Sequence, residues 1–227
     1  MELYIDDADL KEICRLYELY PIDGVTTNPS ILAKTGRNPV QVLKEIRSAL
    51  GSEAVIFAQV IPTDVSGMVR DAHALVSLLG DRTVVKIPSI PEGFRAIRDL
   101  SAEGIRTCGT VVYTPLQAYL AAKSGAAYVA PYINRIDNMG FDGVGMVKKM
   151  QDILDLHEYD TKILAASFKN SQQALDLCTY GIKAATCAPS VIDGFVNNAA
   201  IDSAVRNFVA DFLKVSNGKA SVAELIG

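Results

Sequence analysis

The chain has 227 residues, of which 49% are hydrophobic and 21% are charged, as is typical of globular domains. This composition excludes a disordered chain, a fibrous repeat and a small disulfide-stapled domain. The 22 basic and 26 acidic side chains give a formal charge of -4 without any block of like charges, so the sequence does not indicate a nucleic-acid-binding protein.

Four cysteines and two histidines are scattered along the chain. Because they form no CxxC or Cys/His cluster, we expect the cysteines to be small core residues in a reducing compartment, with no metal bound. The first residues, MELYIDDADLKE, lack the regions of a signal peptide, and no apolar run is long enough to span a bilayer. These features predict a cytoplasmic protein without a membrane partner.

Short apolar segments alternate with amphipathic segments along most of the chain. We expect strands at Leu3–Asp6, Gly24–Asn28, Val55–Val60, Thr83–Pro88, Thr107–Val112, Ala127–Tyr132, Lys162–Ser167 and Ala184–Ala188. We expect helices at Asp9–Leu19, Pro39–Leu50, Asp64–Leu79, Pro91–Ala102, Pro115–Lys123, Gly143–His157 and Ser171–Tyr180. This order predicts a (β/α)8 TIM barrel closed by right-handed crossovers. An open doubly wound sheet is less well supported, since no GxGxxG motif follows the first strand.

An additional helix is expected after the barrel. The segment IDSAVRNFVADFLKV follows Ala200 and carries apolar residues at helical spacing. We therefore expect a barrel domain over residues 1–200 and a C-terminal helix and tail over residues 201–227. Amphipathicity alone does not decide whether this helix packs on its own barrel or on a neighbouring subunit.

Strand residues alternate between the barrel interior and the helix layer, and this alternation places Lys86 inside. The same phase places a mainly polar set of side chains inside: Tyr4, Asp6, Thr26, Asn28, Phe57, Gln59, Thr110, Ala130, Tyr132 and Ser167. The polar members are expected at or near the carboxyl ends of their strands, the face that carries the active site in this fold. We therefore predict an active site there.

Lys86 is the main catalytic candidate in the predicted site. Burial disfavours an ammonium group, and the neutral amine can attack a carbonyl to form a Schiff base. The alternatives are a lysine that extends to the barrel mouth and a lysine that only forms a structural ion pair with Asp6. Asp6 is the interior carboxylate in the pattern, and it would act as a general base or accept a substrate hydroxyl.

Neutral polar side chains complete the predicted interior. Thr26 and Asn28 would contact substrate hydroxyls, although the Asn-Pro step can also simply mark a turn. Gln59, Thr110 and Tyr132 would together hold a water and pass a proton. The alternative for these three residues is a structural role, since buried polar groups commonly pair with one another.

A phosphate site is expected above the sixth and seventh strands. Arg135, Ser167 and Lys169 would supply two cations and a hydroxyl there, and the late loops of barrels commonly bind phosphate. The alternative is that Arg135 pairs with Asp137 or Asp142 on its own loop, because such exposed ion pairs are common.

Several motifs occur in order between Met1 and about Phe212: ELYID, GVTTNPSIL, FAQV, VVKIP, AEGI, GTVVY, AYVAPYINRID and LAASFK. Together they resemble the short transaldolase-like family, and within it the fructose-6-phosphate aldolase branch. The resemblance implies a (β/α)8 class I aldolase with no metal or organic cofactor. It also implies a homodecamer of two stacked pentamers in which the C-terminal helix reaches a neighbour.

The resemblance also implies roles for individual residues. Lys86 matches the family's Schiff-base lysine, and Asp6 and Asn28 match residues that hold the hydroxyls of the bound three-carbon ketone. Ser167 and Arg135 match residues near the phosphate of the aldehyde. These assignments agree with the roles that the strand pattern suggests for the same side chains.

A few positions decide between the branches of the family. Gln59, Thr110 and Tyr132 match the group that positions the catalytic water. Transaldolases typically have glutamate in place of Gln59 and phenylalanine in place of Tyr132. Lys169 falls where transaldolases often have arginine in an ASxR motif. Asp7 departs from the threonine that is usual in relatives, and by strand phase it points outward and caps the next helix.

These features predict a lyase of carbohydrate metabolism that reversibly cleaves fructose 6-phosphate to dihydroxyacetone and glyceraldehyde 3-phosphate. Two alternatives remain: a transaldolase that transfers a dihydroxyacetone unit between sugar phosphates, and a non-catalytic barrel that binds sugar phosphates. The predicted catalytic residues are Lys86, Asp6, Gln59, Thr110 and Tyr132. The predicted substrate-binding residues are Thr26, Asn28, Ser167, Arg135 and Lys169.

Overall fold

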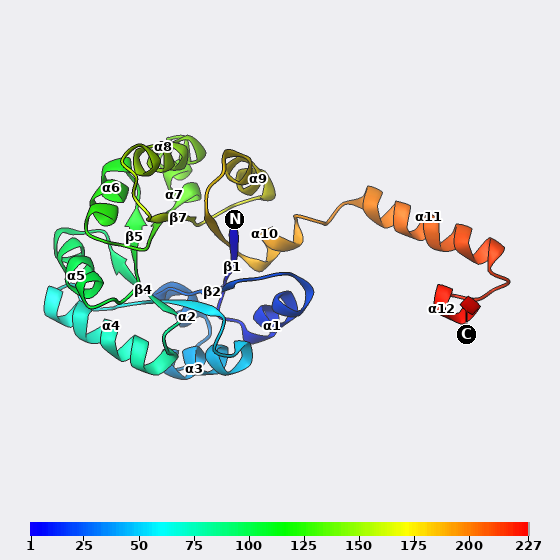
Figure 1. Ribbon diagram of the computed structural model, residues 1–227, viewed down its shortest axis with the longest axis horizontal. Coiled ribbons are helices and arrows are strands. Elements are labelled where there is room, and N and C mark those ends of the chain that lie inside the picture. The colour runs from blue at the N-terminus through cyan, green and yellow to red at the C-terminus, as the bar shows by residue number, and fades with distance from the viewer. Residues whose placement is uncertain (227) are drawn as a thin grey trace. The chain divides into compact units, whose positions relative to one another are not determined.

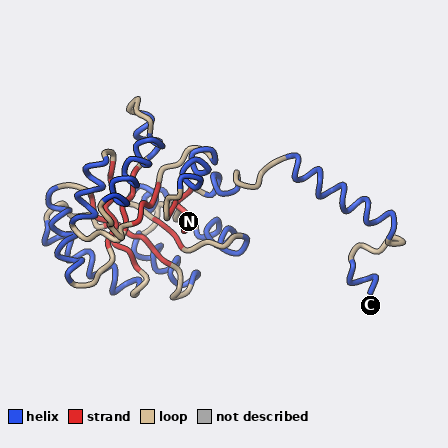
Figure 2. Tube along the Cα trace, turned by 45° about the horizontal axis from the view of Figure 1, so that its top comes forward, coloured by secondary structure: helices blue, strands red, loops and turns tan. Residues whose placement is uncertain are grey.

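Eight parallel strands close into a barrel in the computed structural model, which describes residues 1–226 (Figure 1). The strands are β1 (Glu2–Asp6), β2 (Gly24–Thr26), β3 (Val55–Gln59), β4 (Thr83–Pro88), β5 (Thr107–Val112), β6 (Tyr128–Pro131), β7 (Lys162–Ala165) and β8 (Ala184–Cys187). Each strand pairs with the next, and β8 pairs with β1. Figure 2 shows the strands enclosed by a ring of helices. The predicted (β/α)8 barrel is confirmed.

All seven helices expected between the strands are present, with ends that differ from the prediction by one residue at most. They are α1 (Leu10–Leu19), α3 (Pro39–Leu50), α4 (Val65–Leu79), α5 (Pro91–Ala102), α6 (Pro115–Lys123), α8 (Gly143–Leu156) and α9 (Ser171–Tyr180). Asp9 and Asp64 cap α1 and α4 by accepting backbone N–H groups, so each of these helices begins one residue later than expected.

Three short helices beside the barrel strands were not predicted: α2 (Pro29–Lys34), α7 (Ile133–Asn138) and α10 (Pro189–Asp193). Helices this short do not repeat an apolar face often enough to be recognised by periodicity. The first of them shortens the expected second strand, because Asn28 is the N-cap of α2 and Pro29 is its first residue. β7 likewise ends at Ala165, so the alternation that placed Ser167 inside does not extend to that residue.

The interior of the barrel is filled by alternate side chains of the strands, as the alternation predicted. The buried core comprises Tyr4, Val55, Phe57, Val84, Cys108, Tyr128, Ala130, Leu164 and Ala184. Tyr4 and Tyr128 both pack edge-on against Phe57, with ring centroids 5.0 and 5.1 Å apart. This packed layer supports the polar side chains at the carboxyl ends of the strands.

Two of the four cysteines lie in the core. Cys108 and Cys187 are buried, and burial raises the pKa of each thiol to about 12, so both remain protonated at neutral pH. Cys14 and Cys178 are exposed, which corrects the expectation that all four are core residues. A cysteine on an amphipathic helix fits either face, because it is small and only weakly polar.

The chain divides into two compact units: Met1–Val191 and, after it in the sequence, Ile192–Gly227. The division falls earlier than the boundary expected at residue 200. The second unit contains α11 (Ala199–Val215) and α12 (Val222–Ile226), whereas Gly227, the end of the expected tail, lies outside the described residues. Among residues 1–226, no helix is both long and apolar enough to span a bilayer.

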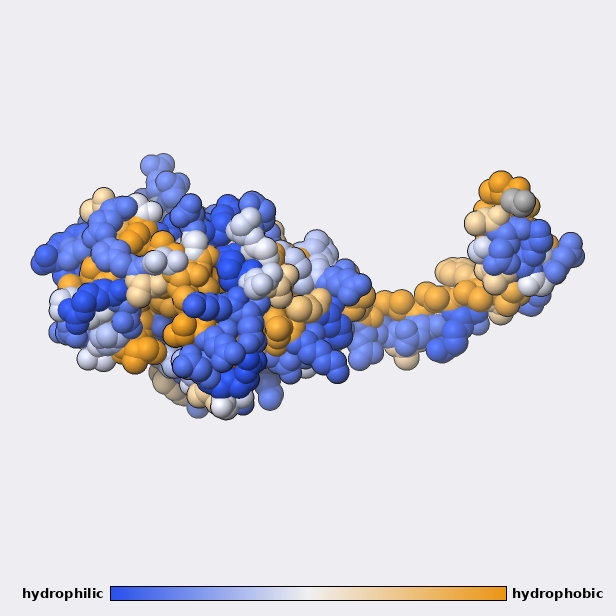
Figure 3. Space-filling model, turned by 90° about the horizontal axis from the view of Figure 1, so that it is seen from below, coloured by the Kyte–Doolittle hydropathy of each residue, from blue (hydrophilic) through white to orange (hydrophobic). Residues whose placement is uncertain are grey.

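The helix expected after Ala200 is present as α11. One side of it is apolar and the other polar, as Figure 3 shows in orange and blue. The apolar stripe comprises Ile201, Val205, Phe208, Val209 and Leu213, and all five side chains are exposed. The docking of this stripe on a neighbouring subunit stays a prediction.

Candidate active site

The carboxyl ends of neighbouring strands bring the predicted residues together in pairs. Asp6 at the end of β1 is in register with Thr26 at the end of β2. Gln59 at the end of β3 is in register with Lys86 of β4. Parallel strands in register place paired side chains on the same side of the sheet, so the barrel itself sets these neighbours.

Lys86 lies inside the barrel with only 3% of its surface exposed. Its ammonium group donates a hydrogen bond to the backbone carbonyl of Thr27 at 3.0 Å. Within residues 1–226 Lys86 forms no ion pair, so the geometry supports neither of the structural alternatives, a lysine at the mouth or one bridged to Asp6. The side-chain nitrogen of Lys86 is therefore buried, with a single hydrogen bond to the described residues.

Asp6 is held by a neutral partner at the end of the adjacent strand. The Thr26 hydroxyl donates a hydrogen bond to Asp6 Oδ1 at 2.7 Å. Burial raises the pKa of Asp6 above its ordinary value; the charge of Lys86 and the Thr26 hydrogen bond oppose this rise, and the charge of Asp7 adds to it. The site therefore has one carboxyl group that takes up a proton more readily than a free aspartate.

Thr186 of β8 is a member of this network that the sequence analysis missed. Its hydroxyl lies 2.6 Å from the Thr26 hydroxyl, and both side chains are buried. Thr186 is in register with Tyr4, an interior residue of β1. Extending the interior phase to the eighth strand would have identified it.

The structure brings together two of the three residues expected to hold a water. The hydroxyls of Thr110 and Tyr132 lie 2.8 Å apart, and both residues are buried. The Gln59 amide makes no hydrogen bond to any of residues 1–226, so both its donor and its acceptor are available to a ligand or a water. Thr110 and Tyr132 therefore pair with each other, but Gln59 does not take part in this pairing.

A bulge in β5 lies directly after Thr110. The pairing with β6 shifts between Gly109 and Val112, and Val111 adopts a left-handed conformation with φ of 60°. This conformation is unfavourable for a β-branched residue and marks local strain. Regular alternation did not predict the bulge, although Gly109 stands at the register shift and an isolated glycine within a strand is a common mark of one.

Gln117 of α6 clamps the segment that follows the bulge. Its side-chain oxygen accepts hydrogen bonds from the backbone N–H groups of Tyr113 and Thr114 at 3.0 and 3.2 Å. Its amide nitrogen donates to the carbonyls of Ser89 and Val111 at 3.2 and 3.4 Å. One side chain thus links the connection after β4 to the connection after β5.

Arg135 of α7 faces two aromatic residues near the site. Its guanidinium lies 4.6 Å from the centre of the Tyr132 ring, and its Nη1 atom lies 3.5 Å from the Tyr113 hydroxyl. The hydrogen bond with Tyr113 raises the pKa of Arg135. The loop carboxylates considered as its partners are bound elsewhere: Asp137 accepts from the backbone N–H of residue 143, and Asp142 caps α8.

The other two expected phosphate ligands lie on the connection between β7 and α9. Ser167 is half-buried and adopts a left-handed conformation with φ of 63°, and its carbonyl accepts a hydrogen bond from Asn134. Lys169 is exposed. Neither the Ser167 hydroxyl nor the Lys169 ammonium has a hydrogen-bond partner within residues 1–226, Arg135 included.

Asn28 has both a structural contact and a free group. Its side-chain oxygen accepts a hydrogen bond from the backbone N–H of Ile31 and so caps α2. The side-chain NH2 group remains able to donate to a ligand. The turn role and the ligand role that the sequence left open are therefore compatible.

A cavity of about 590 Å³ opens beside Asp6 at the carboxyl end of the barrel. Asp7 lines it too and accepts hydrogen bonds from the backbone N–H groups of Ala8 and Asp9. The N-cap of α1 is Asp9, so the expectation that Asp7 caps this helix is wrong. Two cations in its lining, Lys34 and Arg37, were not identified from the sequence. Lys34 is the last residue of the short helix α2 and Arg37 follows that helix, which was itself not predicted.

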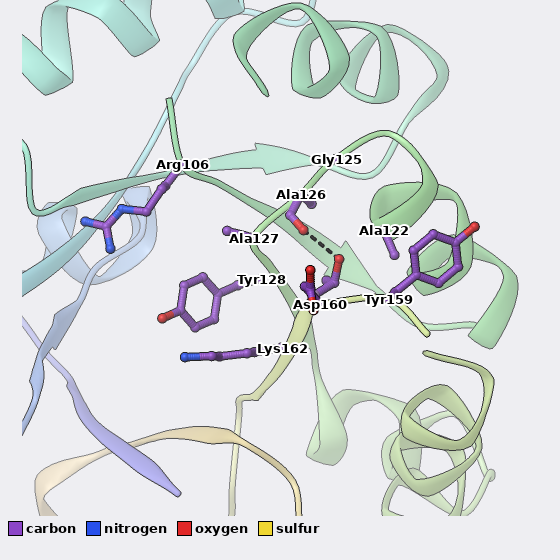
Figure 4. Close-up of a pocket in the computed structure, with 10 residues that line it drawn as sticks. Arg106, Ala122, Gly125, Ala126, Ala127, Tyr128, Tyr159, Asp160 and Lys162 are labelled. Carbon is purple, nitrogen blue, oxygen red and sulfur yellow. Dashed lines mark hydrogen bonds between the residues drawn. The ribbon is translucent and has the colours of Figure 1, made fainter. Parts of the chain in front are cut away.

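A second cavity, of about 430 Å³, lies near the amino ends of β5, β6 and β7 (Figure 4). Beside it Glu2 accepts hydrogen bonds from Tyr4 and Tyr128, both at 3.0 Å, and from Lys162 at 2.6 Å. Tyr4 therefore belongs to the amino end, which corrects its expected place near the carboxyl end. The polar groups here satisfy one another, whereas the carboxyl end leaves donors and acceptors free for a ligand.

Known proteins support the fold and identify the family. A solved structure described as "Native KDPGal structure" superposes with a TM-score of 0.61 at 17% identity, covering 91% of this chain and 97% of that one. A cube-shaped, highly porous cage designed by fusing symmetric oligomeric domains also gives a TM-score of 0.61, at 13% identity, covering 94% of this chain and 78% of that one. At these identities the two structures show the fold alone.

The family model of transaldolase/fructose-6-phosphate aldolase matches residues 3–224, which is nearly the whole chain. The match agrees with the resemblance carried by the motifs around Asp6, Lys86 and Tyr132. The protein therefore belongs to the transaldolase/fructose-6-phosphate aldolase family and is an enzyme of the aldolase and transaldolase group.

Proposed function

We propose that this enzyme is a class I aldolase that cleaves fructose 6-phosphate reversibly to dihydroxyacetone and glyceraldehyde 3-phosphate. The observation that carries the proposal is the buried amine of Lys86, which is held by a single backbone carbonyl inside the barrel. Simple binding of a sugar phosphate has no need for such a group. A Schiff base at this position would draw electrons from the bond to be broken.

The reaction begins when the neutral amine of Lys86 attacks the C2 carbonyl of the open-chain sugar. Loss of water gives an iminium ion, while Asp6, Asn28 and Ser167 hold the substrate hydroxyls. The C4 hydroxyl then gives its proton to the water proposed to lie between Gln59, Thr110 and Tyr132, and the C3–C4 bond breaks, with its electron pair moving toward the iminium nitrogen. Glyceraldehyde 3-phosphate leaves, and an enamine of dihydroxyacetone remains on the lysine.

The second half of the reaction releases the ketone. The enamine takes a proton at C3, and a water adds to the regenerated iminium to release dihydroxyacetone and the free amine. Gln59, Thr110 and Tyr132 are the groups proposed to hold this water. The paired hydroxyls of Thr110 and Tyr132 support the assignment, as does the unpartnered amide of Gln59.

Two of these residues, Gln59 and Tyr132, favour aldolase over transaldolase activity. A glutamine amide cannot ionise, so Gln59 can orient a water but cannot itself carry a proton as a glutamate would. The Tyr132 hydroxyl provides a proton-transfer group that phenylalanine lacks. Both features favour hydrolysis of the intermediate over its retention for a second aldehyde.

The phosphate of the substrate is proposed to bind at Arg135, with Ser167 and Lys169 as further donors. The guanidinium of Arg135 is free of the acidic residues on its own loop, which supports this role. Its position against the Tyr132 ring places a positive charge beside the groups proposed to transfer protons. Thr26 completes the binding set through its hydrogen bond to Asp6.

Release of glyceraldehyde 3-phosphate from fructose 6-phosphate, measured with and without erythrose 4-phosphate, tests the proposal. We expect release without the acceptor, and we expect Lys86→Ala to abolish it while leaving the circular dichroism spectrum unchanged. More than a few per cent of activity in this folded variant would refute the Schiff-base mechanism. Release only with the acceptor would identify a transaldolase.

Trapping with borohydride separates catalysis from simple binding. Reduction in the presence of dihydroxyacetone should attach the three-carbon unit to Lys86, and mass spectrometry of the peptide containing this residue would locate it. Failure to trap an adduct on the wild-type protein would favour a non-catalytic barrel that binds sugar phosphates.

The assembly is proposed to be a cytoplasmic homodecamer of two pentamers in which α11 docks on a neighbouring subunit. The exposed apolar stripe of α11 supports this, because an apolar face of this kind marks an interaction surface. Light scattering on the purified protein should give the mass of ten 24.4 kDa chains. A monomeric mass would contradict this proposal without affecting the proposed chemistry.

A further inference from the structure

Three residues from β8, β2 and β1, of which Thr186 and Thr26 are buried and Asp6 is half-buried, form a continuous hydrogen-bonded chain. Thr186 Oγ1 lies 2.6 Å from Thr26 Oγ1, which in turn lies 2.7 Å from Asp6 Oδ1. Thr186 and Thr26 are 2% and 0% exposed, so water does not compete for the contact between the two hydroxyls. The strand register fixes the chain, because β1 pairs with β8 on one side and with β2 on the other.

Counting protons gives this chain a direction. An ionised Asp6 can only accept, so the single hydroxyl proton of Thr26 points to Asp6. Thr26 then has no proton left for Thr186, and the contact between the two threonines requires the proton of Thr186. When Asp6 is protonated it can itself donate to Thr26, and the chain can reverse.

We propose that Thr186 is a positioning residue for Asp6: acting through Thr26, its hydroxyl fixes the orientation of the carboxylate and favours the ionised form. This inference rests on the proposed function, in which Asp6 holds substrate hydroxyls. The role is one of positioning, since Thr186 touches Thr26 and acts on Asp6 only through it.

The surroundings of Asp6 predict the sign of the effect. Asp6 interacts electrostatically with four charged or titratable groups: Lys86 from β4, Arg135 from α7, Cys187 from β8, and Asp7, which follows Asp6 in the sequence. Burial already raises the pKa of Asp6, and the bond from Thr26 opposes that rise. Hydrogen bonds to an ionised group are stronger than those to a neutral one and strengthen along a chain.

Removing the Thr186 hydroxyl should therefore raise the pKa of Asp6 further, because the ionised form loses more than the protonated form. Thr186→Val removes the hydroxyl and preserves the branched shape, whereas Thr186→Ser keeps the hydroxyl. Thr107→Val is a matched control, since Thr107 is buried in β5 and its hydroxyl has no partner within residues 1–226. Should Thr186→Val fail to fold, Thr186→Ala removes the same group with a smaller side chain.

The test is a pH titration of the Asp6 carboxyl carbon by NMR in protein labelled with 13C-aspartate. The resonance is identified by its loss in Asp6→Asn. We expect an upward shift of the titration in Thr186→Val and titrations like that of the wild type in Thr186→Ser and Thr107→Val. An unchanged titration in folded Thr186→Val or Thr186→Ala would overturn the proposal, as would an equal shift in Thr107→Val.

Kinetics give a second, separate measurement. Loss of one buried hydrogen bond should lower kcat/KM for fructose 6-phosphate about tenfold in Thr186→Val, with recovery in Thr186→Ser. If the wild type neither cleaves the sugar nor traps dihydroxyacetone, the proposed function fails. The titration still tests whether Thr186 acts on Asp6 through Thr26. If the wild type cleaves it and the Asp6 titration is indifferent to Thr186, the function stands and the inference fails.

Discussion

The guanidinium of Arg135 lies 4.6 Å from the centre of the Tyr132 ring, so the cation proposed to bind phosphate also contacts a residue proposed to transfer protons. The contact orders the long Arg135 side chain, which is otherwise exposed. It also holds the ring of Tyr132, whose hydroxyl lies 2.8 Å from that of Thr110. In the proposed mechanism, the groups for substrate binding and for ketone release therefore meet at one aromatic residue, Tyr132.

Arg135→Gln should raise KM for fructose 6-phosphate about 10- to 150-fold, the loss expected for hydrogen bonds to a charged group worth about 1.5–3 kcal/mol. Borohydride trapping of unphosphorylated dihydroxyacetone on Lys86 should change much less, because that ligand carries no phosphate. Tyr113→Phe is the control, since it removes only the 3.5 Å contact to Arg135. Equal losses for both ligands in Arg135→Gln would contradict the phosphate role.

Gln59→Glu combined with Tyr132→Phe should shift the enzyme from cleavage toward transfer. The glutamate can ionise, and the loss of the phenol removes the hydroxyl that lies against Thr110. The ratio of transfer to erythrose 4-phosphate over release of free dihydroxyacetone measures the shift. The single variants Gln59→Glu and Tyr132→Phe show how much of the shift each substitution causes alone. An unchanged ratio in the double variant would refute the branch assignment.

Asp6→Asn should stabilise the fold at neutral pH, with a gain that shrinks as the pH falls. The pKa of Asp6 is raised in the folded state by burial, so stability is greatest when the carboxyl is protonated and is lost as the pH rises through the folded-state pKa. Asparagine keeps the oxygen that accepts from Thr26 and removes the charge. Urea unfolding at pH 5 and pH 7.5 measures the difference.

The opposite trend has a distinct meaning. If Asp6→Asn destabilised the protein, and did so more at higher pH, attraction between Asp6 and Lys86 would outweigh burial. That result would favour the structural ion pair considered from the sequence. The proposed chemistry would then have to explain how the amine of Lys86 is released from it.

The strand pattern predicted the barrel and several interior residues because alternation is a local property of the chain. Lys86 and Asp6 lie in uninterrupted strands, so their phase could be followed directly to the interior. Ser167 could not be placed in this way, since β7 ends before it and its backbone turns left-handed. Alternation could have identified Thr186, but its importance comes from a contact with Thr26 that only barrel closure creates.

The clamp by Gln117 shows a further limit of sequence analysis. Gln117 bonds to Ser89, which is distant in sequence, and to Val111, which has a strained backbone conformation. A local sequence pattern predicts neither the long-range contact nor the strain. The catalytic and binding roles of the named residues stay predictions.

Gln117→Leu should lower kcat for fructose 6-phosphate cleavage several-fold with little change in borohydride trapping on Lys86. Leucine cannot hold the N–H groups of Tyr113 and Thr114, so the segment that orders Arg135 and Tyr132 would loosen. Gln117→Glu keeps the accepting oxygens and should restore part of the activity. Equal activity in all three proteins would show that the clamp has no part in ordering the site.

Gly93→Ala should destabilise the protein by about 3 kcal/mol, as forcing an added group into a packed site does. A Cβ atom on Gly93 would lie 1.8 Å from the backbone carbonyl oxygen of Pro88, which cannot move without shifting the end of the strand that carries Lys86. Gly145→Ala is the matched control in another helix. Its added Cβ would meet the flexible carboxylate of Asp142, so the cost of disturbing that cap, about 1 kcal/mol, is offset by the better helix propensity of alanine.

Urea unfolding of both glycine variants measures the difference. Similar stability of Gly93→Ala and Gly145→Ala would mean that the connection after β4 yields easily. The position of Lys86 would then be set by the barrel interior alone. A large loss confined to Gly93→Ala, with reduced Schiff-base trapping in the fraction that remains folded, would tie the close backbone approach after β4 to the placement of the reactive amine.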